Sequence, residues 1–140
     1  MPIEDADGLR RILHYDRVGV VGASTSYEKA AHIVPAYLQR HGYELHPVNP
    51  TADEIFGTQA FDSLADVPAP IDVVEIFRPS EEVPEIVEQA LARDDVRAIW
   101  MQPGIQHAEA TRDAEAAGVD VVQDRCMKVE HGRLVRHPME

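Results

Sequence analysis

Short apolar runs alternate with longer amphipathic stretches along this chain. The apolar runs predict buried strands over 18–21, 43–48, 71–77, 98–101 and 119–122. Between them, apolar residues spaced three or four positions apart predict helices over 4–14, 29–41, 80–93 and 106–117. Strands that alternate with helices of this length predict an α/β fold, with a doubly wound and mainly parallel sheet covered on both faces.

The ends of these elements carry their own signals. Pro35 lies inside the helix expected over 29–41, so this helix is expected to start late or to kink. Ser80 is the expected N-cap of the helix over 80–93, and Pro84 fits its first turn. The first 16 residues are expected to hold a leading helix. The residues from Met127 onward are polar, so a frayed tail is expected over 129–140.

Ligands of a doubly wound sheet bind beyond the carboxyl ends of its strands, so the segments that follow the strands are the candidate site. These segments are rich in glycine, proline, small hydroxyls and amides, which expose backbone N–H groups without crowding a ligand. They are Gly22-Ala23-Ser24-Thr25-Ser26, Asn49-Pro50, Arg78-Pro79, Gln102-Pro103-Gly104 and Gln123-Asp124-Arg125-Cys126.

The first of these segments has the features of an anion site. Gly22 permits a sharp exit from the strand, and Ser24, Thr25 and Ser26 supply small donors. The following helix offers free N–H groups and the positive end of its dipole, and Lys29 adds a full charge. The segment predicts a phosphate-binding loop; an ordinary strand–loop–helix turn is the alternative.

The sequence does not favour a dinucleotide. The first strand and turn, Gly19-Val20-Val21-Gly22-Ala23-Ser24, lack the glycine spacing of the dinucleotide fingerprint. The second strand ends in Val48-Asn49-Pro50, with no carboxylate placed to bind a ribose. A P-loop lysine motif is also absent from the sequence.

Several segments together resemble the small stand-alone CoA-binding proteins, which are similar to the N-terminal CoA-binding domain of the succinyl-CoA synthetase α subunit. The matching segments run in order from Arg17 to Lys128: Val20-Val21-Gly22-Ala23-Ser24, Val34-Pro35-Ala36-Tyr37-Leu38, Gly42-Tyr43, Pro47-Val48-Asn49-Pro50, Ile55-Phe56-Gly57, Ser63-Leu64-Ala65-Asp66-Val67-Pro68, Ile71-Asp72-Val73-Val74, Trp100-Met101-Gln102-Pro103-Gly104-Ile105 and Asp124-Arg125-Cys126-Met127-Lys128. The resemblance implies a single Rossmann-like domain over 1–140 that binds coenzyme A or an acyl-CoA.

The resemblance also implies roles for particular positions. The loop Gly22-Ala23-Ser24-Thr25-Ser26 with Lys29 would meet the CoA phosphates, and Asn49-Pro50 would line the nucleotide end. Phe77-Arg78-Pro79 would lie along the adenine or the pantetheine, and Met101-Gln102-Pro103-Gly104 would border the thiol end. Lys29 stands where the family often carries arginine, and Glu28 beside it weakens the positive potential.

Composition narrows the class of partner. The formal net charge is −12, which disfavours nucleic acid and anionic membranes. General solubility explains this charge, and an acid-rich surface suited to high salt is the alternative. Only Lys29 and Lys128 are lysines, which fits the high-salt surface but also a GC-rich genome that replaces lysine with arginine. No apolar run approaches the ~20 residues of a membrane span, and the acidic start is unlike a signal peptide, so a cytoplasmic location is expected. The single cysteine excludes an internal disulfide.

The sequence contains no recognisable catalytic or metal-binding constellation. Its seven histidines form neither a triad nor an H-E-x-x-H pair, and a solvated helix face explains the glutamates after Ser80 better than a metal does. His32 and Cys126 are open between a packing role and a chemical one, and Glu75 needs a polar partner or a sheet end.

We therefore expect a non-catalytic module that binds CoA as a sensor, carrier or subunit. The alternatives are a small NAD(P)- or acyl-CoA-dependent enzyme and an interaction protein with a degenerate nucleotide pocket. The sequence allows a protein partner or a homo-oligomer.

Overall fold

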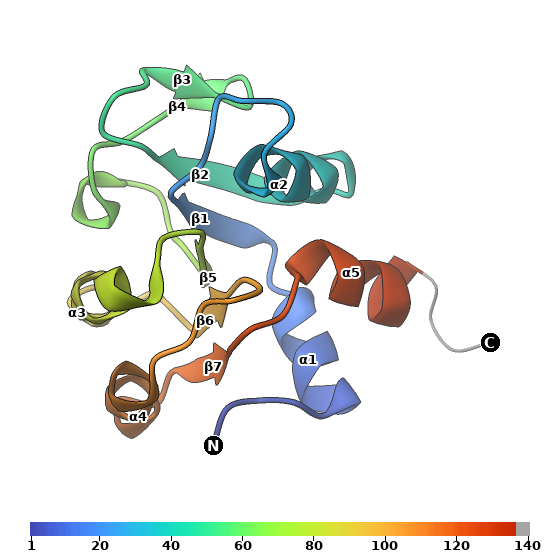
Figure 1. The fold of residues 1–140 in the computed structure, drawn as a ribbon, viewed down its shortest axis with the longest axis vertical. Coiled ribbons are helices and arrows are strands. Elements are labelled where there is room, and N and C mark those ends of the chain that lie inside the picture. The colour runs from blue at the N-terminus through green and yellow to red at the C-terminus, as the bar shows by residue number, and fades with distance from the viewer. Residues whose placement is uncertain (137–140) are drawn as a thin grey trace.

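The computed structural model describes residues 1–136, which form an α/β domain around one parallel sheet (Figure 1). The strands are β1 (Arg17–Val21), β2 (Glu44–Val48), β5 (Val73–Ile76), β6 (Ala98–Met101) and β7 (Asp120–Val122), in the order β2-β1-β5-β6-β7. Every neighbouring pair is parallel, which confirms the predicted fold class. The chain leaves β1 for β2 and then crosses to the other side of β1 for β5, so the strand order reverses beside β1.

The helices divide between the two faces of the sheet. One face is covered by α1 (Ala6–Leu13), α2 (Ala30–Arg40) and α5 (Met127–His131), and the other by α3 (Val83–Leu91) and α4 (Ala108–Ala116) (Figure 1). Each face has its own hydrophobic core. Leu9, Leu38 and Trp100 belong to the first, and Ile86 and Ile99 to the second. Burial on both faces explains why the strands are almost continuously apolar.

Prolines shape the starts of two helices. Pro35 lies inside α2, which begins at Ala30, one residue later than predicted. The predicted N-cap at Ser80 is wrong, because a 3-10 turn over Ser80–Glu82 precedes α3, whose N-cap is Glu82. In an α-helix the residue at position 84 would donate its N–H to the carbonyl of Ser80, but Pro84 has no N–H. The N–H of Val83 donates to this carbonyl instead, which gives the 3-10 turn.

The polar tail is helical rather than frayed through residue 136. The helix α5 continues into a π-helical turn, Gly132–Arg136, and Met127 and Leu134 are buried against the first core. Arg10 Nε donates a hydrogen bond to the carbonyl of Leu134, which ties this segment to α1. Met127 and Leu134, seven positions apart, are its two buried apolar residues. The sequence analysis did not predict this burial, because two apolar positions in an otherwise polar segment are a weak signal. The remainder of the predicted tail, 137–140, lies outside the described residues.

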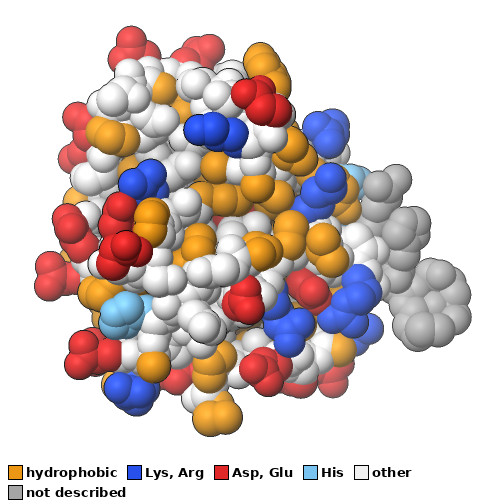
Figure 2. Space-filling model, in the orientation of Figure 1, with side chains coloured by type: hydrophobic (Ala, Val, Ile, Leu, Met, Phe, Trp, Pro, Cys, Tyr) orange, Lys and Arg blue, Asp and Glu red, His pale blue; other side chains and the backbone are white. Residues whose placement is uncertain are grey.

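Charge is distributed unevenly over the face in Figure 2. Lys and Arg side chains gather over α1 and α5, whereas acidic side chains border the side of α3 and α4 (Figure 2). The whole chain carries a formal net charge of −12. No helix in the described part of the chain is both long and apolar enough to cross a bilayer.

Truncating Leu134 tests whether the C-terminal segment belongs to the core. Leu134 is 4% exposed, so Leu134→Ala should lower the free energy of unfolding by about 2 to 4 kcal/mol, as measured by urea denaturation. Val129→Ala is the matched control, because Val129 is 58% exposed on α5 and its truncation should change stability by less than about 0.5 kcal/mol. Equal, small effects of both substitutions would show a frayed segment.

Candidate functional site

A cleft of about 350 Å³ opens where β1, β2 and β5 end, beside the reversal of strand order. Ligands of open parallel sheets bind at this position, since the crossovers on either side leave in opposite directions. The cleft is lined by Val21, Gly22, Ala23, Val48, Asn49, Pro50, Asp62, Ser63, Arg78, Glu82, Glu85, Ile86 and Gln89. Five of these residues, namely Gly22, Ala23, Asn49, Pro50 and Arg78, belong to the set predicted from the sequence.

Gly22 turns the chain out of β1 and into the cleft wall. Its φ is +88°, a conformation that residues with a side chain rarely adopt. A Cβ at this position would lie 2.8 Å from Cδ of Arg78, which comes from the loop after β5. Glycine is therefore required both by the turn and by the close approach of the arginine stem.

The β1–α2 loop is held by three hydrogen bonds around Ser24. Pro35 has no N–H, so the carbonyl of Ala31 cannot form its usual helical bond, and the N–H of Ser24 donates to it at 3.2 Å. His32 Nδ1 donates to the carbonyl of Ser24 at 2.7 Å, and Ser24 Oγ accepts from the N–H of Ser26 at 3.0 Å. His32 thus fastens the loop to α2, which is the packing role that the sequence left open.

Asn49 joins the end of β2 to the same loop. Its Nδ2 donates to the carbonyl of Ala23 at 3.0 Å, and its Oδ1 accepts from the N–H groups of Thr51 and Ala52 at 2.8 and 3.0 Å. Both ends of the amide are therefore engaged in shaping the cleft. These three hydrogen bonds, which we call the Asn49 clamp, give the asparagine after β2 a structural role that needs no ligand.

The cleft is electrostatically mixed. Arg78 is the one Lys or Arg among its lining residues, whereas Asp62, Glu82 and Glu85 are acidic. Arg78 and Glu82 form a two-pronged ion pair, with Nε to Oε1 at 3.0 Å and Nη2 to Oε2 at 2.8 Å. The hydrogen bonds from Arg78 lower the pKa of Glu82, and those to Glu82 raise the pKa of Arg78.

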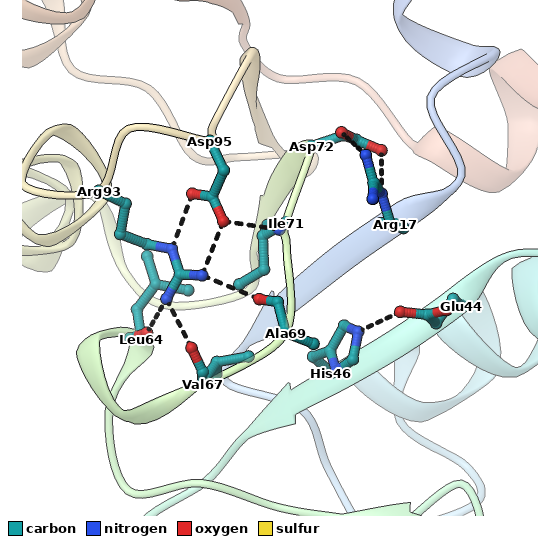
Figure 3. Close-up of polar contacts among 10 residues, drawn as sticks. All are labelled: Arg17, Glu44, His46, Leu64, Val67, Ala69, Ile71, Asp72, Arg93 and Asp95. Atoms are coloured by element: carbon teal, nitrogen blue, oxygen red, sulfur yellow. Dashed lines mark hydrogen bonds and ion pairs between the residues drawn. The ribbon is translucent and has the colours of Figure 1, made fainter.

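Asp62 and Ser63 line the cleft, and Arg93 holds the loop that follows them. Figure 3 shows the guanidinium of Arg93 among the carbonyls of this loop and the carboxylate of Asp95. Arg93 Nη1 donates to the carbonyls of Leu64 and Val67, and Nη2 donates to that of Ala69, all at 2.9–3.0 Å. Asp95 accepts from the remaining guanidinium N–H groups, and these bonds lower the pKa of Asp95. Arg93 thus forms five hydrogen bonds, three to the backbone of the segment that follows Asp62 and Ser63 and two to Asp95.

The other predicted site residues lie outside the cleft lining. Lys29 is the exposed N-cap residue of α2 and forms no ion pair within the described residues. Thr25 is exposed, and Ser24 and Ser26 are partly exposed. After β5, Phe77 is partly buried against the first core and Pro79 is exposed.

The predicted residues at the end of β6 divide by burial. Met101 and Gln102 are buried, whereas Pro103 and Gly104 are exposed. Gln102 Oε1 accepts from the N–H of Met127, so it holds the start of α5. Contacts of these residues with a ligand stay a prediction.

The sequence analysis missed the wall of the cleft that α3 supplies. Glu82, Glu85, Ile86 and Gln89 are spaced i, i+3, i+4 and i+7, so they share one face of the helix. This spacing is visible in the sequence. It predicts a shared face but not which side of α3 turns toward the strand ends, so the four residues could not be assigned to a site.

A second cavity, of about 360 Å³, lies near the end of β7. Its lining is mainly polar and consists of Pro2, Glu4, Gln106, Gln123, Asp124 and Arg125. Cys126 comes directly after Arg125 in the chain and is the half-buried N-cap residue of α5. Within the described residues, no three His, Cys, Asp or Glu side chains are grouped closely enough to hold a metal ion.

Glu75 lies fully buried in β5, the middle strand of the sheet, between Val20 of β1 and Trp100 of β6. Neither a polar partner nor a sheet end supports it, contrary to the sequence-based expectation: within the described residues neither carboxylate oxygen has a hydrogen-bond partner. Burial instead raises the pKa of Glu75 to about 8, so the side chain is largely protonated at neutral pH. Neutralisation is how the core tolerates this carboxyl.

Replacing Glu75 should change how stability depends on pH. The folded protein keeps the Glu75 proton between about pH 4.5 and 8 while the unfolded chain loses it, so the free energy of unfolding falls as the pH rises through this range. Glu75→Gln removes the titrating group and with it this loss of stability. The free energy of unfolding of the variant should therefore exceed that of the wild type by a few kcal/mol at pH 9, but by much less at pH 5. Urea denaturation at pH 5, 7 and 9 measures the difference.

Glu88→Gln on the exposed face of α3 is the control for that experiment, and its stability should follow the wild type at each pH. If the free energies of unfolding of Glu75→Gln and the wild type differ by the same amount at every pH, Glu75 is not a carboxyl that burial keeps protonated.

The strand order, the two helical layers and the cleft beside β1 define a Rossmann-like domain. The sequence model of the family described as CoA binding domain matches residues 16–132. The chain belongs to this CoA-binding domain family, as the resemblance predicted.

Stand-alone relatives match nearly their whole length. The chain is 40% identical over 115 residues to the uncharacterized protein YneT of Bacillus subtilis (strain 168), covering 82% of this chain and 84% of that protein. It is also similar to the structure of a hypothetical protein from Pyrococcus horikoshii OT3, with a TM-score of 0.90 and 38% identity over 96% of each chain. These matches extend the similarity to the whole fold.

Larger relatives contain this domain as one part. Acetate–CoA ligase (ADP-forming) II of Archaeoglobus fulgidus is 28% identical over 109 residues, which are 76% of this chain but 16% of the ligase. The dinucleotide-forming acetyl-coenzyme A synthetase 1 of Ca. Korarchaeum cryptofilum, solved with phosphate and ADP, matches with a TM-score of 0.69 and 27% identity over 81% of this chain and 26% of that chain.

Proposed function

We propose that this protein binds coenzyme A or an acyl-CoA in the cleft between β1, β2 and β5. The observation that carries the proposal is the position of the cleft. It lies at the reversal of strand order, where this fold binds nucleotides, in a chain that belongs to a CoA-binding domain family.

The geometry supports this ligand class at two points. Gly22, Asn49 and Arg78 all line the cleft, where the ends of β1, β2 and β5 meet, and the Asn49 clamp, through its bond to the carbonyl of Ala23, holds the first two strand ends together. The β1–α2 loop continues from this entrance to Lys29 at the start of α2, which supplies the N–H groups and charge that phosphates need.

We further propose that the protein has no chemistry of its own and serves as a sensor, carrier or subunit. Three histidines have structural contacts, to which the proposal adds no catalytic role: His32 bonds to the carbonyl of Ser24, His107 caps α4, and His131 bonds to the hydroxyl of Tyr37. The cytoplasmic location stays a prediction of the sequence.

Ligand-dependent thermal stability separates this function from its alternatives. A ligand that binds only the folded state raises the free energy of unfolding by about 2.7 kcal/mol at 100 times its dissociation constant. We expect CoA and acetyl-CoA to stabilise the protein, and NAD, NADP and ATP to do so less at equal concentration. Stabilisation by NAD or NADP alone would instead favour the dinucleotide enzyme, and none by any ligand would favour an interaction protein.

Reversing the charge of Lys29 tests whether the α2 end of the loop meets the phosphates. Lys29→Glu should weaken CoA binding by about threefold or more in calorimetric titration while the unfolding temperature stays unchanged. Arg97→Glu makes the same charge change at an exposed position just before β6, at the amino-terminal end of the strands and so away from the cleft, and should have a smaller effect. Equal affinities of both variants would remove Lys29 from the site.

A further inference from the structure

Arg78 is the cationic group best placed to meet a ligand phosphate in the cleft, yet its hydrogen-bonding edge is occupied. The stem of Arg78 crosses Gly22, where a Cβ would lie 2.8 Å from Cδ and 3.2 Å from Cγ. This contact places the guanidinium beside the β1–α2 loop. Its Nε and Nη2 groups both donate to the carboxylate of Glu82, four residues later.

The carboxylate of Glu82 takes the place of a ligand anion in this pairing. A guanidinium binds a carboxylate or a phosphate through the same two-pronged arrangement of donors. The edge of Arg78 formed by Nε and Nη2 can therefore serve either Glu82 or a phosphate, but not both in this geometry.

The ion pair is also easy to exchange. The side chains of Arg78 and Glu82 are 48% and 45% exposed, and pairs at this exposure contribute little to stability. Glu82 lies in the 3-10 turn before α3, and no hydrogen bond from its side chain caps the helix. Its carboxylate can leave Arg78 without disturbing the core or the helix.

We propose that Glu82 is an intramolecular competitor of the ligand phosphate for Arg78, and that it thereby sets the affinity of the cleft. This inference rests on the proposed function, because the competing phosphate is that of CoA. In the free protein Glu82 holds Arg78. On binding, the phosphate takes the Nε–Nη2 edge, and Glu82 turns toward solvent.

The competition explains an otherwise unfavourable arrangement. An anionic ligand approaches a cleft with three carboxylates and one guanidinium, on a chain of net charge −12. A ligand without an anionic group has nothing with which to displace Glu82. The cleft therefore favours ligands with a phosphate or a similar two-pronged anion, at a cost in affinity that the Glu82 side chain controls.

Calorimetric titration of CoA into a set of variants tests the inference. Glu82→Gln should tighten CoA binding by about two- to fivefold, the range expected for release of an exposed ion pair. Glu81→Gln is the matched control, since it removes the same charge from the preceding exposed position, which does not line the cleft. Its affinity should stay closer to that of the wild type.

A double-mutant cycle separates competition from general repulsion. In the Arg78→Gln background, Glu82→Gln should no longer change CoA affinity beyond the effect of Glu81→Gln. An equal gain from Glu81→Gln, a gain that persists without Arg78, or no gain from Glu82→Gln would overturn the inference while leaving CoA binding intact. If neither the wild type nor any variant binds CoA, the proposed function fails, and the inference fails with it.

Discussion

The shape of the β1–α2 loop depends on a hydrogen bond that Pro35 makes available. A proline inside α2 leaves the carbonyl of Ala31 without its helical donor, and the N–H of Ser24 takes that carbonyl. Asn49 and His32 then hold the carbonyls of Ala23 and Ser24. The loop is thereby fixed to both α2 and β2. The shape of the cleft thus depends on Pro35, a residue type that usually weakens the interior of a helix.

Charge is the second constraint on this molecule. A chain of net charge −12 has to attract an anionic ligand through local features rather than through its overall field. The features at hand are the backbone of one loop, the start of α2, Lys29 and Arg78. The pairing of Arg78 with Glu82 shows that even this local charge is balanced in the free protein. Affinity is therefore expected to depend on Lys29 and on the exchangeable ion pair of Arg78 with Glu82.

The sequence was sufficient for the sheet and for one side of the cleft. Buried parallel strands are apolar runs, and a glycine such as Gly22 marks the end of the first one, so both could be predicted from local pattern. Contacts between distant segments could not. Arg93 bonds to the carbonyl of Leu64, 29 residues away. Leu134 is buried in the same core as Leu9 of α1, and Arg10 of that helix bonds to its carbonyl. The α3 wall depends on the direction in which that helix turns, which periodicity alone leaves open.

The central claim is that CoA occupies the cleft at the ends of β1, β2 and β5. Mapping backbone amide chemical shifts during a titration with CoA tests it most directly. The account predicts saturable shifts concentrated at Gly22, Ala23, Asn49 and Arg78 and along the β1–α2 loop. Shifts confined to the second cavity, around Gln106 and Arg125, or no saturable shifts at all, would contradict it.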